Sequence, residues 1–327
     1  MVNIEEYLRQ NKPEISDSTV SAYTVNLEKL HDRLHGTRSF EDLEWLKDSA
    51  AVLESLQKHC VSYLTQRNYL NAVVVILLNR DGFQAALHTY QAHRDKFNDQ
   101  YMEIQQTKEP SAKQAQNWVP LSEIRELIDE YDEHAKLLRN HADINLKDKV
   151  AMQDRFMLHF WTTYPMRNDL HDTRVITKRV FNALDQVDKD NNNYIIVGKE
   201  VVLSIGNYKT RKKYGVKKIP IEEKPVLKAM KQWLSVSPNS EYILVNVKDG
   251  TPMSSLHITQ NLTRIFKKHF NKSVGSTLLR HIVLTEKFGK QLQDMELMAD
   301  MMAHTVSTAH NIYIKNVDNN SSDECSE

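Results

Sequence analysis

The chain has 327 residues, with 43 basic and 43 acidic side chains and therefore a formal net charge of zero. This balance gives no general support for a nucleic-acid partner, so any such function must come from local clusters of charge. The length allows at least one sizeable core and predicts two domains, and the low content of Gly and Pro, 8 of each, favours helices.

The two cysteines, Cys60 and Cys325, are far apart and follow no metal-ligand spacing. This spacing predicts no metal site. Because the chain begins without a basic and apolar signal segment, we expect an intracellular, reducing compartment. The longest apolar run, residues 72–78, is far shorter than the roughly 18 to 20 residues that a helix needs to cross a bilayer. We therefore predict a soluble protein.

The first third of the chain has the pattern of a small helical bundle. Residues 16–34 begin with Ser and Asp, which cap helices, and then place apolar residues at steps of three and four. Residues 51–64 and 65–97 add further helices, and one of them is nearly apolar all round and so expected to be central. Residues 109–118 are polar and lack apolar periodicity, which predicts a linker between two domains near residue 110.

The pattern changes from helices to short strands beyond this linker. Residues 121–138 and 148–167 are predicted to be helical. The β-branched segments 193–198, 200–205 and 216–221 predict a small antiparallel sheet, and residues 241–247 form a further strand-like run. The chain then ends in helices and a polar, acidic tail that is expected to be disordered. The predicted fold class is mainly α with a small antiparallel β-sheet (α+β).

One cluster of positive charge stands out, in residues 207–218, where basic side chains occur without an acid and alternate with Tyr208 and Tyr214. A hairpin this basic could neutralise several phosphates, although a solvated loop is the alternative interpretation. Its basic residues are Lys209, Arg211, Lys212, Lys213, Lys217 and Lys218.

The sequence around two arginines suggests that each could bind an anion. Arg167 follows a proline at the predicted start of a helix, where it could meet an anion or pair with Asp169 or Asp172. Arg280 lies in an apolar helical segment, "STLLRHIVLTEKF", and needs a partner there, either an acid or a substrate phosphate. The adjacent His281, taken alone, is interpreted as a structural histidine.

Near the end of the chain, "AHTVSTAHNIY" places His304 nine residues before Tyr313. Ser307 is a suitable N-cap, which would put Tyr313 on a short final helix with His304 in the preceding turn. This geometry can hold a phenol and an imidazole near one another, and packing of Tyr313 with Ile312 is the alternative interpretation. A separate set of residues is interpreted as core filling, because Met suits irregular gaps. The set comprises Met295, Met298, Met301 and Met302.

In order and spacing, these residues resemble the tyrosine recombinase (phage-type integrase) family. The segment "AHTVSTAHNIY" is similar to the family's "GHSSISTTQIY" ending, "LLRH" matches its "LRH" core, and "NYKT" occupies the place of its hairpin lysine. The segment "RNDL" is similar to the corresponding segment in integrases of large DNA viruses or their mobile elements. The matching residues are Arg167, Lys209, Arg280, His281, His304 and Tyr313.

The resemblance covers most of the chain and implies a two-domain DNA clamp. Residues 1–108 would form a helical core-binding (SAM-like) domain, residues 119–318 the catalytic domain, and residues 319–327 a disordered tail. Three positions depart from the family's pattern: Thr277 stands where His or Lys is usual, Leu170 where an acid is usual, and Ala303 where Gly is usual. The loss of the His or Lys removes one expected phosphate contact.

The resemblance implies a chemistry in which Arg167 and Arg280 hold the phosphate and His304 adds a donor. Tyr313 would attack to give a 3′-phosphotyrosyl intermediate, and Lys209 would protonate the departing 5′ oxygen. Three further residues would support the site, namely His281, Thr277 and Asp169. The remaining basic residues of the hairpin would contact DNA, namely Arg211, Lys212, Lys213, Lys217 and Lys218.

The implied partner is double-stranded DNA, on which a homotetramer would act through a four-way junction without a cofactor. The compartment would be wherever the target DNA lies, in the cytoplasm of a prokaryote or in the nucleus or viral factory of a eukaryotic host. The sequence leaves three alternatives: a DNA-binding clamp that has lost the chemistry, a type IB topoisomerase, and a plain helical interaction protein.

Overall fold

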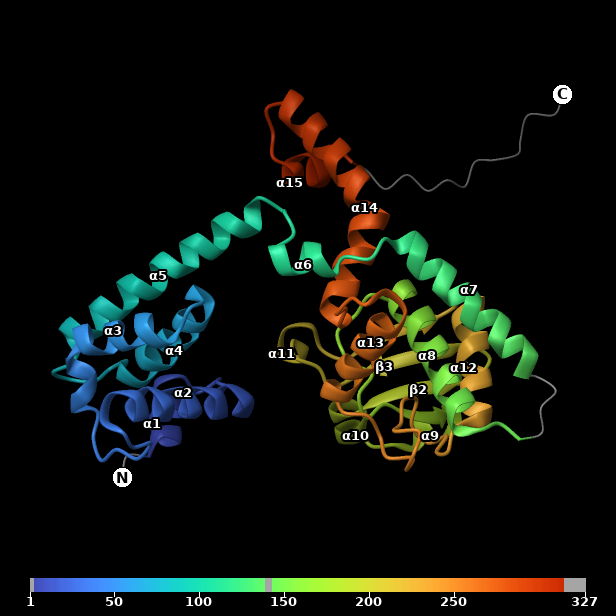
Figure 1. The fold of residues 1–327 in the computed structure, drawn as a ribbon, viewed down its shortest axis with the longest axis horizontal. Helices are drawn as coiled ribbons and strands as arrows, with labels where there is room; N and C mark the ends of the chain where they lie inside the picture. The colour runs from blue at the N-terminus through green and yellow to red at the C-terminus, as the bar shows by residue number, and fades with distance from the viewer. Residues whose placement is uncertain (1–2, 139–142, 315–327) are drawn as a thin grey trace. The chain divides into compact units, whose positions relative to one another are not determined.

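The computed structural model describes residues 3–138 and 143–314 and divides the chain into two compact units, Met1–Pro110 and Ser111–Glu327 (Figure 1). Each unit has its own apolar core. The tail at residues 319–327, which the sequence predicts to be disordered, lies outside the described residues. No helix in the described part of the chain is both long enough and apolar enough to span a bilayer.

The first unit is helical, and its central helix α4 packs against α1, α2 and α5. Its α-helices are α1 (Ile4–Asn11), α2 (Asp17–His35), α3 (Ser49–His59), α4 (Tyr63–Leu77) and α5 (Gln84–Gln106). The second half of α4 is buried on all sides, which confirms the central place predicted from its apolar sequence. Helix α2 begins where Ser16 accepts a hydrogen bond from the backbone of Thr19 and ends at Gly36, whose φ of 73° suits glycine.

The second unit combines helices with a small sheet. Its first helix, α6, lies in the segment predicted to be a linker and begins with a capping box formed by Ser111 and Gln114. The helices are α6 (Ala112–Asn117), α7 (Leu121–Leu137), α8 (Leu146–Thr163), α9 (Lys178–Ala183), α10 (Gln186–Asn191), α11 (Arg211–Tyr214), α12 (Lys224–Val236), α13 (Ser255–Phe270), α14 (Ser276–Met301), α15 (Val306–Thr308) and the π-helical turn η3 (Ala309–Tyr313).

The sheet contains the three predicted strands and one more. In the described residues its order is β1-β2-β3-β4. Strands β2, β3 and β4 pair antiparallel as predicted, whereas β1 pairs parallel with β2, so the sheet is mixed. Parallel pairing needs a long connection, which here runs through α9 and α10. The strands are β1 (Arg174–Thr177), β2 (Asn193–Val197), β3 (Val201–Ile205) and β4 (Lys217–Ile221).

The strand-like run at residues 241–247 forms isolated bridges and not a strand. A side chain takes the place of a neighbouring strand: the Gln153 amide donates to the Val245 carbonyl at 3.0 Å, and its oxygen accepts from the Val245 N–H at 2.9 Å. Because these bonds satisfy the buried backbone, the run can lie in the core without a full strand partner.

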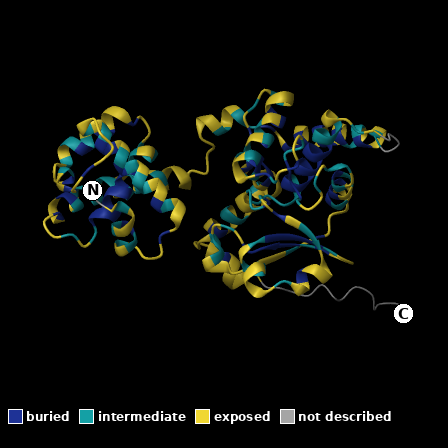
Figure 2. Ribbon diagram, turned by 90° about the horizontal axis from the view of Figure 1, so that it is seen from below, coloured by how far each residue is buried: buried dark blue, intermediate teal, exposed yellow. Residues whose placement is uncertain are grey.

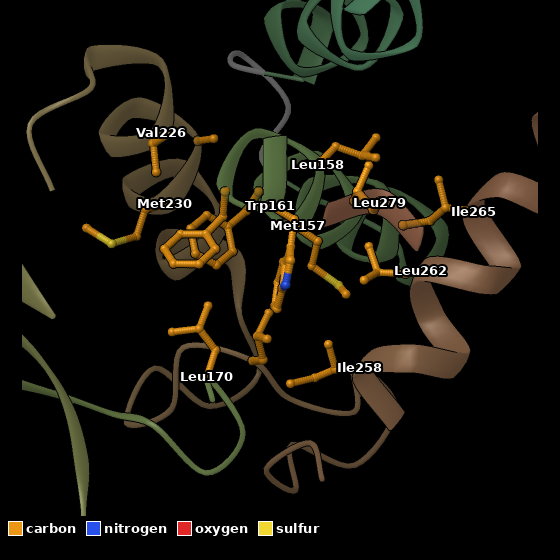
Figure 3. Close-up of a cluster of buried hydrophobic side chains, with 14 of the residues drawn as sticks. Met157, Leu158, Trp161, Leu170, Val226, Met230, Ile258, Leu262, Ile265 and Leu279 are labelled. Carbon is orange, nitrogen blue, oxygen red and sulfur yellow. The ribbon is translucent and has the colours of Figure 1, made fainter. Parts of the chain in front are cut away.

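Helix α8 is the centre of the second core. It packs against α7, α12, α13 and α14, and Figure 3 shows its apolar side chains surrounded by those of the neighbouring helices. Figure 2 shows buried residues along the strands and exposed residues on the outward faces of the helices. The labelled core residues are Met157, Leu158, Trp161, Leu170, Val226, Met230, Ile258, Leu262, Ile265 and Leu279.

A buried ionic network links α7, α8 and α12. Arg155, which is 2% exposed, donates to the Asp132 carboxylate at 2.5 Å and to the Gln232 side chain at 2.6 Å. His159 lies 2.9 Å from the same carboxylate oxygen of Asp132. Burial raises the pKa of Asp132, but the hydrogen bonds from His159 and Arg155 outweigh this effect and lower it below its usual range.

We predict that Asp132→Ala destabilises the second unit by about 3 kcal/mol, because it leaves the buried guanidinium of Arg155 without its counter-charge. Urea denaturation followed by tryptophan fluorescence measures the change, and Asp129→Ala, at an exposed position of the same helix, should have little effect. Because the folded pKa is lowered, the carboxylate contributes fully above about pH 4 and its contribution is lost as the pH falls through the folded value. Equal stability of both variants would contradict the prediction.

Candidate active site

Arg167 lies in a turn between α8 and β1 and not at the start of a helix as predicted. Pro165 disfavours a helical conformation at Tyr164, where α8 ends. The turn is fixed by Asn168, whose amide donates to the Ser255 carbonyl at 2.8 Å and to the Thr259 hydroxyl at 2.7 Å. The start of α13 therefore holds the backbone next to Arg167 in place.

Arg280 lies in the second turn of α14, close to Arg167. Its guanidinium donates to the Met166 carbonyl at 3.4 Å, and its buried Nε has no hydrogen-bond partner among the described residues. Burial lowers the pKa of Arg280, and the positive charge of Arg167 lowers it further, against the opposing effect of Asp169. An anion between the two guanidinium groups would relieve both effects.

Asp169 supplies the acid of this cluster. Leu170, which occupies the family's acidic position, is fully buried in the core. Burial raises the pKa of the Asp169 carboxyl, against the lowering effect of the positive charges around it. Those charges belong to Arg167, His171, Arg280 and Lys217. The carboxylate thus lies among cations, and the cluster retains an excess of positive charge.

The other two predicted supporting residues lie beside Arg280 on α14. Thr277 is exposed in the first turn, one turn of helix before Arg280, so the two can share a face. His281 is also exposed. Thr277 is therefore not packed inside the unit.

The basic segment at residues 207–218 comprises the loop between β3 and β4, which contains the short helix α11, and the first two residues of β4. The Tyr208 hydroxyl closes the loop by donating to the Gly215 carbonyl at 2.6 Å. Lys217 Nζ lies 5.5 Å and 4.9 Å from the ring centres of Tyr208 and Tyr214. Arg211 contacts Asp190 and Asn191 outside the loop. The exposed basic residues of the segment are Lys209, Lys212, Lys213, Lys217 and Lys218.

Tyr313 and His304 form a contact pair. The phenol oxygen lies 3.1 Å from Nε2 of His304, and the rings are stacked with their centres 5.4 Å apart. Tyr313 is 56% exposed. The N-cap of α15 is Thr305, and not Ser307 as predicted, because the Thr305 hydroxyl accepts from the backbone of the third residue of the helix.

The turn between α14 and His304 places Ala303 at a φ of 54°, a region that favours glycine. This conformation explains physically why the glycine of the resembled pattern suits this position. The surrounding hydrogen bonds hold the turn: the Ala303 N–H donates to the Asp300 carbonyl and the His304 N–H to the Ala299 carbonyl, both at 2.9 Å.

The structure does not bring the Tyr313 pair to the arginines. Figure 1 shows α14 as one continuous helix. Its bounds, Ser276–Met301, place Arg280 near its start and His304 beyond its end. At 1.5 Å per residue, about 30 Å of helix separates Arg280 from the turn that carries His304. The candidate site is therefore in two halves in this conformation.

The far half of α14 is largely uncovered. The interpretation of its methionines as core filling is wrong for Met298, Met301 and Met302, which are exposed. A cavity of about 290 Å³ lies between the far half of α14 and η3, and its lining includes Met298, Met302 and Tyr313. The exposed large apolar residues of α14 are Leu284, Phe288, Leu292, Leu297, Met298 and Met301.

Sequence reasoning missed Asn193, the first residue of β2, which is 3% exposed and bonded to the backbone of the Arg167 turn. The available signal was an amide at the start of an otherwise apolar strand, since a buried amide needs partners.

Comparison with known proteins gives a match in fold. No protein-family model and no curated protein matches the chain. Among solved structures, the XerH site-specific recombinase bound to difH substrate in a pre-cleavage complex has a TM-score of 0.50 and 15% identity, over 96% of this chain and 92% of that one. A post-cleavage complex of XerH with palindromic difH substrate has a TM-score of 0.47 and 14% identity, over 94% and 90% of the two chains.

The chain thus has the two-domain fold of the tyrosine recombinases, mainly α with a small sheet, which confirms the predicted resemblance and fold class. Nothing in the comparisons supports the viral or mobile-element origin suggested by the segment "RNDL".

We predict that inorganic phosphate stabilises the second unit by binding between Arg167 and Arg280, because an anion offsets the repulsion of the two guanidinium groups. At constant ionic strength, replacing chloride with phosphate should raise the midpoint of thermal unfolding, and Arg280→Gln should remove most of the rise. Arg125→Gln, at an exposed position of α7, should retain it. An equal rise in all three proteins would place the phosphate elsewhere.

Proposed function

We propose that this protein is a DNA recombinase that cuts and rejoins strands through a tyrosine nucleophile. The observation that carries the proposal is the 3.1 Å contact between the exposed Tyr313 phenol and His304, in a chain with the tyrosine recombinase fold. The cationic cluster around Arg167 and Arg280 supports it, since a phosphodiester is the anion that the reaction presents.

In the proposed reaction, Arg167 and Arg280 bind the non-bridging oxygens of one phosphodiester and stabilise the charge that grows there in the transition state. The Tyr313 oxygen forms a bond to phosphorus while the bond from phosphorus to the 5′ oxygen breaks. His304, already in contact with the phenol, accepts its proton. The product is a 3′-phosphotyrosyl link and a free 5′ end.

Lys209 would supply the proton that the departing 5′ oxygen needs. It lies in the exposed basic loop between β3 and β4, whose other cations would contact the DNA backbone on either side. The phosphotyrosyl link conserves the energy of the phosphodiester, so a 5′ hydroxyl from another strand can reverse the attack without a nucleotide. By analogy with the fold, four copies would exchange strands between two duplexes.

The proposal requires the two halves of the site to meet, because reacting atoms must approach to about 3–3.5 Å. Tyr313 can reach the arginines of the same chain if α14 bends, or those of a second copy if it stays straight. Gly289 lies midway along α14, and glycine weakens a helix by about 1 kcal/mol relative to alanine.

We predict that Tyr313→Phe abolishes covalent attachment to DNA and leaves binding nearly intact, because it removes one oxygen from an exposed side chain. The protein is incubated with end-labelled nicked duplexes of varied sequence, and a protease-sensitive labelled band is sought after denaturation. Tyr214→Phe, which removes an exposed phenol from the basic loop, serves as the control and should still form the band. A band with Tyr313→Phe would assign the nucleophile to another residue.

We further predict that DNA brings the end of α14 toward its start or toward a second copy. Spin labels on cysteines introduced at Thr277 and His310, with Cys60 and Cys325 replaced by serine, should be far apart in the free protein, because about 25 Å of helix separates Thr277 from the part of α14 that lies beside η3. A shorter distance should appear with DNA. Labels placed on the same or on separate chains tell which arginines Tyr313 reaches, and an unchanged distance in the attached complex would refute the requirement.

A further inference from the structure

The side chain of Asn193 connects the Arg167 turn to the loop that carries Lys209. Its amide nitrogen donates to the Asp169 carbonyl at 2.9 Å and to the Asn207 carbonyl at 3.0 Å. Its oxygen accepts from the Gly206 N–H at 3.0 Å and from the Asn207 N–H at 2.8 Å. One amide thus uses both of its N–H groups and both lone pairs of its oxygen.

The two segments joined by Asn193 carry two candidate residues that would act on one phosphodiester, Arg167 on its non-bridging oxygens and Lys209 on its leaving oxygen. Asp169 is two residues after Arg167, and Asn207 is two residues before Lys209. Because Asn193 is 3% exposed, water does not compete for these bonds and the amide has little freedom to move. The spacing between the two backbone segments is therefore set at one buried point.

The base of the loop has no room to adjust around this point. A Cβ added at Gly206 would lie 2.4 Å from the Asp190 carbonyl oxygen, so the chain leaving β3 is pressed against the end of α10. The Gly206 N–H also donates to the Asn192 carbonyl at 3.1 Å. The base of the loop is fixed, while Lys209 itself is exposed.

We propose that Asn193 is a positioning residue that sets the separation of Lys209 from Arg167, so that the ammonium reaches the leaving oxygen of the phosphodiester that the guanidinium holds. This inference rests on the proposed function. A displacement of about 1 Å in such an arrangement can lower a rate on the order of 100-fold. Asn193 acts only through the backbone that it holds and does not touch the substrate.

The test uses Asn193→Asp, which keeps the shape of the side chain and its accepting oxygen. The amide nitrogen, which donates to two carbonyls, is replaced by an oxygen that can only accept. The full-length variant should fold and bind DNA like the unsubstituted protein, and its attachment to an ordinary nicked duplex should be slower by about 100-fold. With a 5′-bridging phosphorothiolate, whose sulfur leaves without a proton, most of the rate should return, as expected for Lys209→Ala. Asn192→Asp is the matched control, since its amide bonds to the Asp188 carbonyl in α10.

A second readout separates positioning from a purely structural role. Combined with Lys209→Ala, Asn193→Asp should cause little further loss on the ordinary substrate, because both act on the same proton transfer. Equal losses on both substrates, or additive losses in the double variant, would overturn the inference. If Asn193→Asp does not fold, Asn193→Ser takes its place in the same comparisons. Failure of the unsubstituted protein to attach to either substrate would instead refute the proposed function.

Discussion

The candidate site of the second unit depends on a core that holds two like charges close together. Arg167 and Arg280 come from a turn and a helix far apart in the chain, and their guanidinium groups repel one another. Like charges in a partly desolvated site repel one another more strongly than they do in water. Burial of each large apolar side chain contributes about 1.5–3 kcal/mol, and α14 is fixed by several, including Leu279. The core therefore maintains a site whose electrostatics favour an anion.

The candidate site of the second unit is divided into two halves, which lie apart in this conformation. One half is held by partly buried polar contacts, in which Asn168 links the Arg167 turn to α13 and Asn193 links it to the basic loop. The other half, Tyr313 with His304, is internally ordered by a short capped helix but stands at the far end of α14. Tyr313 and the two arginines are therefore far apart in the described conformation.

Local patterns predicted much of this structure, and long-range contacts account for what they missed. Strands β2 to β4 follow from short β-branched segments separated by turn residues, and the Tyr313 pair follows from a nine-residue spacing. The four-residue strand β1 was missed because its pairing depends on β2, beyond two helices. The role of Asn193 depends on partners 14 and 24 residues away. The two halves of the candidate site lie apart because α14 continues without a break through Gly289. The amphipathic pattern of the sequence does not determine whether the helix continues there.

The exposed apolar residues of α14 affect the free energy of bringing the two halves of the candidate site together. Side chains such as Phe288 and Leu292 face solvent in this conformation, so covering them would be favourable by about 1.5–3 kcal/mol for each one fully buried. A bend at Gly289 sacrifices a few backbone hydrogen bonds, each worth about 1 kcal/mol net. The two terms are similar in size, and the interactions made with DNA can therefore decide the balance. In the proposed reaction, the arrangement would withhold the nucleophile until the substrate that completes the site is bound.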